Sequence, residues 1–359
     1  MAENPIEIWF FDPSLTFIGL EDHYEAIRYR QRWNTYGDFE ICLCRMIPQA
    51  KLGNIVVFGH NGRKNGVIRY IRMEEDGKVR IRGYSLLWLL TQRITIPPAG
   101  EDCLTVSDTQ ENVMRTLVDQ NAIHPENVSR IIPHLSLGKR AQAGRMITFQ
   151  SRYAGLDREI GSLSESSGLG VSIDFDYQRQ ECLFCVRQGT DRSCEQEKRS
   201  PVIFCMDYDT IESRTYEISD MDAKTCAVIA GKGEGADRAV YVYGDELAMN
   251  ERREIFIDAK DIKDPLLLPE RAATKLAEWK PAEAYECILS LEGYAKKWDI
   301  GDYVTVLDPE LGIRKRMQIT AVEESVDRNG GYEVEATAGE AAKSVAEHLR
   351  NRTAAGSAE

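Results

Sequence analysis

The sequence predicts a β-rich α+β protein in which two strand-rich regions flank a mixed one. Alternating polar and apolar residues fill most of the first hundred positions, and the same alternation returns from about residue 170. Helical spacing of apolar residues is confined to a few short segments. With 359 residues and 43% hydrophobic content, the chain is long enough for two or three folding units.

The first strand-rich region is predicted to be an antiparallel meander. In residues 78 to 83, Lys and Arg alternate with Val, Ile and Gly, so one strand face is charged and the other packs on a core. Three pairs supply the positive-φ residues that tight hairpin turns need. They are Asn61-Gly62, Asn65-Gly66 and Asp76-Gly77.

Helices are predicted at five places along the chain. The first is SLLWLLTQRI at 85 to 94, and Ser107 begins an SDTQ capping box before the apolar stripe from Val113 to Val118. A further helix spans about 153 to 166 and ends before Gly168. Another follows Pro269, and a short amphipathic one covers 342 to 349 before a disordered tail.

Charge and cysteine usage narrow the class of protein. A formal charge of −13 argues against binding that depends on neutralising phosphates, which needs excess Lys and Arg. The N-terminus lacks the basic start and apolar run of a signal peptide, and no stretch is long and apolar enough to span a membrane. Nine scattered cysteines indicate reduced thiols and no required disulfides.

Several motifs that often mark catalytic or metal sites have simple structural explanations in this sequence. Cys182 and Cys185 have CxxC spacing, but they fall on a predicted strand, so their thiols should point to opposite faces. The glycine-rich loop 231 to 235 is followed by a strand and not by the helix that a phosphate site requires. The five histidines form no HxxxH pair and no GxSxG elbow exists, so we predict no metal and no cofactor.

Acidic pairs leave an enzymatic alternative open. Asp174 and Asp176, and likewise Asp207 and Asp209, lie two apart on predicted strands and so share a face. Such pairs could serve as glycosidase carboxylates or bind a cation. A chain with 58 Asp and Glu residues contains such spacings by chance, and the simpler interpretation is a solvated sheet face.

The stretch RYRQRWNTYGDFEICL at 28 to 43 concentrates arginine and aromatic residues. Its aromatics could be core residues of a long strand. Arg and Trp are also enriched in protein interfaces, so a subunit contact is the alternative. We therefore predict Arg30, Trp33 and Tyr36 as interface residues, although Arg30 and Trp33 point to opposite faces of a regular strand.

The order of several segments resembles the tail-hub proteins of long-tailed phages, which are relatives of the baseplate hub of contractile tails. The resemblance runs from about residue 5 to 340. It rests on segments such as HYEAIRYRQRWNTYGDFEICL, VRIRGYSLLWLLTQRI, AVIAGKGEGADRAV and WDIGDYVTVLD. The residues that match the family's short structural motifs are Gly37, Asp38 and Phe39, then Gly83, Leu86 and Arg93, and finally Gly301, Asp302 and Val304.

The resemblance implies two tail-tube-like β-barrel domains joined by a mixed α/β insertion. The implied bounds are 1–100 for the first barrel, 101–205 for the insertion, 206–340 for the second barrel with one helix, and 341–359 for a short helix and disordered tail. Three copies would form a ring that adapts the six-fold tail tube to a three-fold tip. The lumen of this homotrimer would be the path for DNA, and an acidic lumen would let DNA slide without specific binding.

The resemblance also implies the setting of the protein. Its partners would be the distal tail protein ring, the tape measure protein, and tip, fibre or receptor-binding proteins, at the tip of the virion tail after assembly in the bacterial cytoplasm. Some relatives carry a C-terminal peptidoglycan hydrolase, and no such region follows residue 340, so we expect no enzyme. The alternatives are a peptidoglycan or carbohydrate hydrolase and a carbohydrate-binding tail module.

Overall fold

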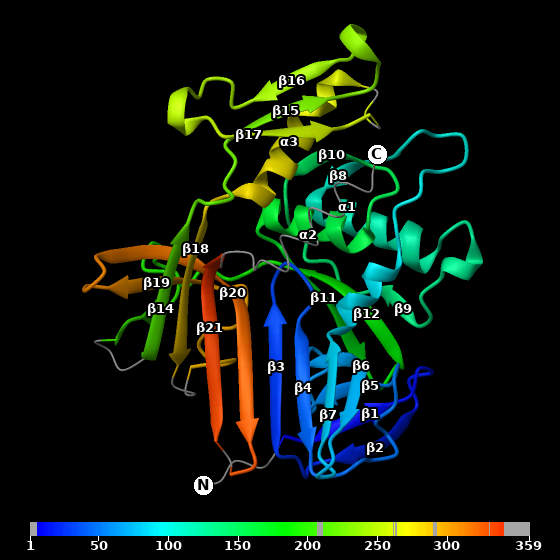
Figure 1. The fold of residues 1–359 in the computed structure, drawn as a ribbon, viewed down its shortest axis with the longest axis vertical. Coiled ribbons are helices and arrows are strands. Elements are labelled where there is room, and N and C mark those ends of the chain that lie inside the picture. Colours follow the sequence, from blue (N-terminus) through cyan, green and yellow to red (C-terminus); the bar gives the residue numbers. More distant parts are fainter. Residues whose placement is uncertain are drawn as a thin grey trace.

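One large sheet runs through both strand-rich regions of the chain in the computed structural model (Figure 1). The structure describes residues 6–206, 211–260, 262, 264–289, 293–329 and 331–340. The strand order is β14-β18-β21-β20-β3-β4-β7-β6-β5-β1-β2, with β19 and β13 branching from β20. The protein is therefore β-rich, as the sequence predicts, and segments nearly 300 residues apart lie side by side where β3 meets β20.

We call β3, β4, β7 and β6 the first half-sheet. Its strands come from the first predicted region. The strands β5, β1 and β2, which continue the sheet beyond β6, come from the same region. Their bounds are β1 Ile8–Phe11, β2 Phe17–Glu21, β3 Ala26–Arg32, β4 Asp38–Leu43, β5 Ile55–Phe58, β6 Asn65–Met73 and β7 Val79–Tyr84. Apolar residues at alternate positions, such as Phe39, Ile41 and Leu43 in β4, point to one face and form a buried core.

We call β20, β21, β18 and β14 the second half-sheet. The bounds in this region are β13 Ile203–Phe204, β14 Ile211–Ser219, β18 Ala282–Leu289, β19 Tyr303–Asp308, β20 Ile313–Asp327 and β21 Tyr332–Glu340. A second core lies on its inner face around Tyr285, Val322 and Val334. All seven pairings from β14 to β6 are antiparallel, so the two half-sheets form one continuous antiparallel stretch of eight strands.

The mixed insertion packs against the first region. Its elements are η1 Leu86–Gln92, β8 Leu104–Thr109, α1 Gln110–Val118, η2 Asp119–Ile123, η3 Val128–Arg130, β9 Leu135–Leu137, β10 Met146–Ser151, α2 Leu156–Ser167, β11 Gly170–Asp176 and β12 Glu181–Arg187. The stripe that the sequence predicts, Val113 to Val118, is fully buried together with Phe11 and Val57 of the first region. One core thus spans the boundary at residue 100.

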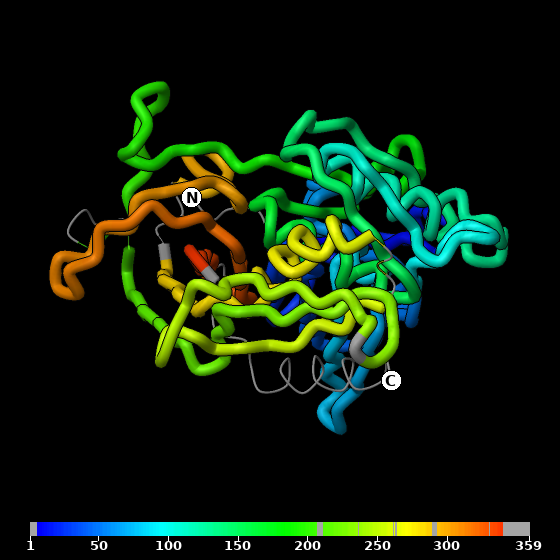
Figure 2. The backbone as a smooth tube through the Cα atoms, turned by 90° about the horizontal axis from the view of Figure 1, so that it is seen from above, coloured from blue at the N-terminus to red at the C-terminus, as the bar shows by residue number. Residues whose placement is uncertain are grey.

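A small α/β layer interrupts the second half-sheet between β14 and β18. It contains β15 Cys226–Ala230, η5 Gly235–Asp237, β16 Val240–Tyr243, η6 Met249–Glu251, β17 Glu254–Asp258, η7 Pro265–Leu267, α3 Leu268–Leu276 and η8 Ala277–Trp279. Figure 2 shows α3 lying along the three-stranded layer. Ala227, Ile229, Leu268 and Ala272 form its own small core.

Two local predictions are wrong. Asn65 and Gly66 begin β6 and are not a turn, because the Asn65 side chain is fully buried and hydrogen bonded to Gly62, Ile173 and Leu86. Ser107 lies in β8, and Thr109 caps α1 instead by accepting from the Asn112 N–H.

Other local predictions are confirmed. Gly168 ends α2 in the left-handed conformation, at φ +72°, and Gly77 has φ +85° in the turn between β6 and β7. The predicted helix at 342 to 349 and the predicted disordered tail lie outside the described residues. Among the described residues, no helix is long and apolar enough to cross a membrane.

Candidate functional site

The outer face of the first half-sheet is rich in arginine. Arg28, Arg30 and Arg32 alternate with the inward residues Ile27 and Tyr29, as the sequence predicts. Further arginines lie on the same face of β7. In the ladder between β4 and β7, Arg82 lies opposite Glu40 and Arg80 lies opposite Cys42. Glu40 forms ion pairs with both Arg80 and Arg82. Arginine thus dominates the outer face of β3 and β7, with Glu40 of β4 between them.

The outer face of the second half-sheet is acidic. Glu323 of β20 is paired with Glu335 of β21, and Glu286 lies on the next strand, β18. Burial, and then the nearby carboxylates of Glu286 and Glu323, raise the pKa of Glu335 above its usual value. Repulsion between carboxylates held close together thus contributes to the raised pKa of Glu335. The two half-sheets therefore present opposite charges on one continuous face.

The opposite charges meet at the β3–β20 junction. The Arg28 guanidinium bridges Asp38 at 2.6 Å and Glu323 at 3.0 Å, and Arg30 approaches Glu323 at 3.8 Å. Asp38, one of the family-motif residues, thus belongs to an ion-pair cluster. An open hollow of about 420 Å³ at this junction is lined by Arg28, Glu40, Glu333 and their neighbours.

Trp33 joins three parts of the chain. Its backbone N–H donates to Thr320 of β20, its backbone oxygen accepts from Val171 of β11, and its indole N–H donates to Gly168 at 3.0 Å. The indole is only 4% exposed and is packed against Gly170 and Gly301, where a Cβ atom would overlap the ring. Gly301 also has φ +90°, so both space and conformation require glycine there.

The other motif residues also have structural tasks. Gly37 lies against the Arg30 carbonyl, and Gly83 lies under the Phe39 ring, so neither position has room for a side chain. Asp302 accepts hydrogen bonds from the Thr190 and Asp299 N–H groups and pairs with Arg192 at 2.7 Å.

Two further motif residues join the insertion to its surroundings. The Arg93 guanidinium donates to the backbone oxygens of Arg130 and Ile131. The buried Leu86 donates its backbone N–H to the Asn65 side-chain oxygen. These contacts are all within the chain.

The three residues predicted as an interface lie in different environments. Trp33 is in the core, whereas Tyr36 is half-buried, packs on the core that the insertion shares with the first region and meets the Tyr84 ring edge-on at 5.4 Å. Arg30 lies on the outer face, opposite in direction to Trp33. Among the three, Arg30 and Tyr36 retain surface that a neighbouring subunit could contact.

A buried ionic cluster behind the junction is absent from the sequence-based predictions. Glu324 is 4% exposed, binds Lys64 at 2.6 Å and accepts hydrogen bonds from the hydroxyls of Tyr294 and Tyr332. The alternation in β20 contains the signal, because Glu324 lies between the buried Val322 and Val326 on the same face. The cluster links β20 and β21 to Lys64, which directly precedes β6, and to Tyr294 in the segment between β18 and β19.

The residues considered for chemistry are mostly held in structural contacts. Asp174 is ion paired with Arg187, whereas Asp207 and Asp209 lie outside the described residues. Cys182 and Cys185 alternate between the two faces of β12, and burial raises their pKa values to about 12 and about 11. All nine cysteines are free thiols.

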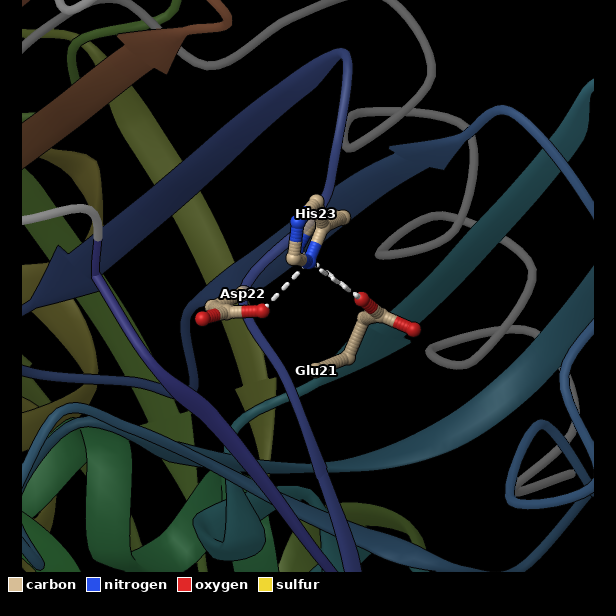
Figure 3. Close-up of side chains that lie close together, drawn as sticks. All are labelled: Glu21, Asp22 and His23. Atoms are coloured by element: carbon tan, nitrogen blue, oxygen red, sulfur yellow. Dashed lines mark hydrogen bonds and ion pairs between the residues drawn. The ribbon is translucent and has the colours of Figure 1, made fainter.

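A three-residue cluster is the one group of potential metal ligands within the described part of the chain. Figure 3 shows the side chains of Glu21, Asp22 and His23 close together. The His23 Nδ1 lies 2.6 Å from the Asp22 carboxylate, the His23 side chain is 90% exposed, and the three consecutive residues lie at the end of β2 and just after it. Without a buried fourth ligand, the cluster does not form a cage for a metal ion.

The fold defines the class of protein. The chain matches the crystal structure of a tail protein from Neisseria meningitidis MC58 with a TM-score of 0.58 and 16% identity, covering 94% of this chain and 97% of that one. A 43 kDa tail protein of prophage MuSo2 from Shewanella oneidensis matches with a TM-score of 0.58 and 12% identity, over 92% and 98% of the two chains. Prophage tail protein gp18 from Listeria monocytogenes EGD-e matches at 0.53 and 13%, over 96% and 98%.

These likenesses show the fold of phage tail proteins. The sequence itself matches the model of the siphovirus ReqiPepy6 Gp37-like protein family over residues 5–340. The chain therefore belongs to this siphovirus protein family. No curated protein matches the chain at the sequence level.

Proposed function

We propose that this tail protein is a hub: a homotrimeric ring at the tail tip that adapts the six-fold tail tube to a three-fold tip and surrounds the DNA path. The observation that carries the proposal is the eight-stranded antiparallel stretch from β14 to β6. Each copy would contribute these eight strands, four from each half-sheet, to a closed barrel. The distal tail ring, the tape measure protein and separate tip or fibre proteins would be its neighbours.

Both ends of the eight-stranded stretch have an unpaired edge in the described part of the chain. β14 pairs only with β18, and β6 pairs with β5 only as far as Val67, which leaves residues 69–73 open on one side. Open edges of this length are templates for pairing with another chain. Because seven antiparallel pairings separate β14 from β6, the two strands run in opposite directions. β14 of one copy could therefore extend an antiparallel ladder with β6 of the next.

Charge supports the same pairing. The edge at β14 carries the exposed Glu217, and the edge at β6 carries the exposed Arg72. The β3–β20 junction already joins an arginine-rich strand to an acidic one through Arg28 and Glu323. A junction between copies would repeat this arrangement, with the basic half-sheet of one copy beside the acidic half-sheet of the next.

In such a ring the outer face of the sheet would line the lumen. This face is not uniformly acidic, so the lumen would carry alternating basic and acidic sectors. Several of the arginines are already paired with Asp38, Glu40 or Glu323. Paired arginines and repelling carboxylates both disfavour tight phosphate binding, which suits passage of DNA without specific contacts.

Light scattering on the full chain tests the ring. We expect a mass three times that of one chain, or, if the ring forms only on the tail, a three-fold ring in electron micrographs of purified tails. Arg72→Glu is expected to weaken the trimer about tenfold, and combining it with Glu217→Arg should restore part of the loss. Lys78→Glu, a charge reversal in the β6–β7 turn, serves as the control. Monomers in solution together with tails lacking a three-fold ring would overturn the proposal.

A further inference from the structure

A third open edge lies at the far end of the sheet, away from the eight-stranded stretch. β2 pairs with β1 on one side and ends the strand order, so its other side has no partner strand among the described residues. The proposed ring uses β14 and β6 and leaves β2 free. A strand that pairs with this edge would therefore not be the β14 or β6 strand of the neighbouring copy.

The side chains of β2 are unusually apolar for an exposed edge. Phe17 is 50% exposed, Ile18 37% and Leu20 40%, within a strand of five residues. Open edges are commonly protected by lysine, proline, inward charges or bulges, and of these β2 has a bulge at Ile18 and the mostly buried Glu21 at its end. Three large apolar side chains nevertheless stay exposed along the edge, which indicates a surface that is covered in the working assembly.

The apolar surface is also held in place. The Phe17 ring meets the rings of Trp9 and Phe11 edge-on, each at 5.6 Å between centroids. Leu20 lies opposite Trp9 in the ladder and Phe17 opposite Phe11, and the β-bulge at Ile18 puts the two side chains on the same face. A ligand would therefore meet a preformed strand and would not have to order it, which lowers the entropic cost of binding.

One end of the strand is acidic. Glu21 ends β2 and Asp22 follows it, and the ion pairs of both carboxylates in the described structure are with the exposed His23 (Figure 3). The Asp22 side chain is 43% exposed, so a lysine or arginine on a ligand could reach its carboxylate without displacing another cationic side chain of the described structure. Glu21 is only 13% exposed and accepts the His23 N–H. The edge thus combines backbone hydrogen-bonding groups, an apolar stretch and an acidic end.

We propose that β2 accepts an extended segment of a different protein as an added strand, with apolar residues at alternate positions and a lysine or arginine facing Asp22. A second copy fits less well. Antiparallel self-pairing centred on Gly19 would place each Glu21 carboxylate opposite the Phe17 ring of the other copy, which desolvates a charge without pairing it. A two-fold contact also does not belong to a three-fold ring.

Hydrogen exchange on the full chain tests this inference. The probe is the acetylated and amidated hexapeptide Lys-Thr-Val-Thr-Ile-Thr, and the readout is exchange of the amides in residues 17–21. We expect at least tenfold slower exchange at saturating peptide. A peptide N-methylated at alternate residues, which cannot form the ladder, should give no protection, and replacing its lysine with glutamate should weaken binding several-fold.

Leu20→Lys should weaken peptide binding at least tenfold, whereas Leu52→Lys, at a position that is 64% exposed and off the strand, should bind like the unmodified chain. An unchanged melting temperature shows that Leu20→Lys is folded.

Absence of protection at millimolar peptide would overturn the inference, as would equal effects of the two variants. Protection that rises with protein concentration alone would assign the edge to a second copy. The trimer mass of Leu20→Lys is measured separately, so failure here is distinct from failure of the ring.

Discussion

The two half-sheets share one architecture and differ in charge and continuity. In both, apolar residues at alternate positions face a core, as Phe39 and Ile41 do in the first and Val334 and Ala336 in the second. Their outer faces are basic and acidic respectively, and the opposite charges meet where Arg28 binds Glu323. The comparison shows that the inward residues determine the fold. The outward residues can differ between the half-sheets, and so they can determine which surfaces the sheet binds.

The half-sheets also differ in how added segments attach. The insertion after the first half-sheet shares its core with β1, β5 and β6, whereas the layer that interrupts the second half-sheet has a small core of its own. That layer is tied to the insertion by a buried ion pair between Arg271 of α3 and Glu159 of α2. The layer in the second half-sheet is therefore attached to the insertion by specific polar contacts, whereas the insertion is attached to the first region by a broad apolar surface.

The largest expected effect is at the residue that joins the halves. Trp33→Ala should lower the free energy of unfolding by about 3–5 kcal/mol, because it removes a buried ring that contacts Gly170 and Gly301. Chemical denaturation measures the loss. Tyr36→Ala, half-buried in the same stretch, should cost only about 1–2 kcal/mol. Equal losses would mean that Trp33 does not link the two half-sheets.

The next effect concerns the layer in the second half-sheet. Arg271→Ala should cost about 3 kcal/mol at neutral pH, because it leaves the Glu159 carboxylate buried and unpaired. Arg145→Ala removes an exposed ion pair to Glu270 at the same contact and should cost less than about 0.5 kcal/mol. Equal destabilisation by the two variants, measured by thermal unfolding, would contradict the role of the buried pair.

The same pair predicts a pH dependence. Burial opposes ionisation of Glu159, but Arg271, Lys275 and hydrogen bonds outweigh it and lower the pKa of Glu159 below its ordinary 4.5. The stabilisation is therefore fully present above about pH 4.5 and is lost as pH falls through the lower pKa of the folded state. Unfolding curves between pH 6 and 3 should show a shallower acid loss in Glu159→Gln than in the unmodified chain.

A smaller effect is expected at the motif glycine of the second half-sheet. Gly301→Ala should cost about 2 kcal/mol, since the new Cβ meets the Trp33 ring at a residue with positive φ. Gly312→Ala is the matched control, because Gly312 also has positive φ but open space around it. It should cost about 1 kcal/mol by conformation alone. A control as costly as Gly301→Ala would remove the packing argument.

The smallest effect is at the charged junction itself. A double-mutant cycle on Arg28→Ala and Glu323→Ala should give a coupling of at most about 1 kcal/mol, because both side chains are partly solvated. The coupling should fall as salt is added. A coupling that is large and independent of salt would show that charge, and not apolar alternation, holds the half-sheets together.

Much of the local structure follows from the sequence alone. Alternation placed Arg28, Arg30 and Arg32 on one face of β3 and Cys182 and Cys185 on opposite faces of β12, because side chains along a strand alternate by geometry. The prediction of a turn at Asn65-Gly66 is wrong because this pair, although common in turns, is buried here. The Asn65 side chain forms hydrogen bonds with backbone groups of two other segments.

Only the tertiary structure decided which segments meet. The pairing of β3 with β20, the contact of Trp33 with Gly170 and Gly301, and the burial of Glu324 beside Lys64 all join residues far apart in sequence. Strand alternation fixes which face a residue occupies but carries no information about the neighbouring strand. The sequence by itself thus determined the strands and their inward faces. The joining of two half-sheets into one surface of opposite charges came from long-range packing of those faces.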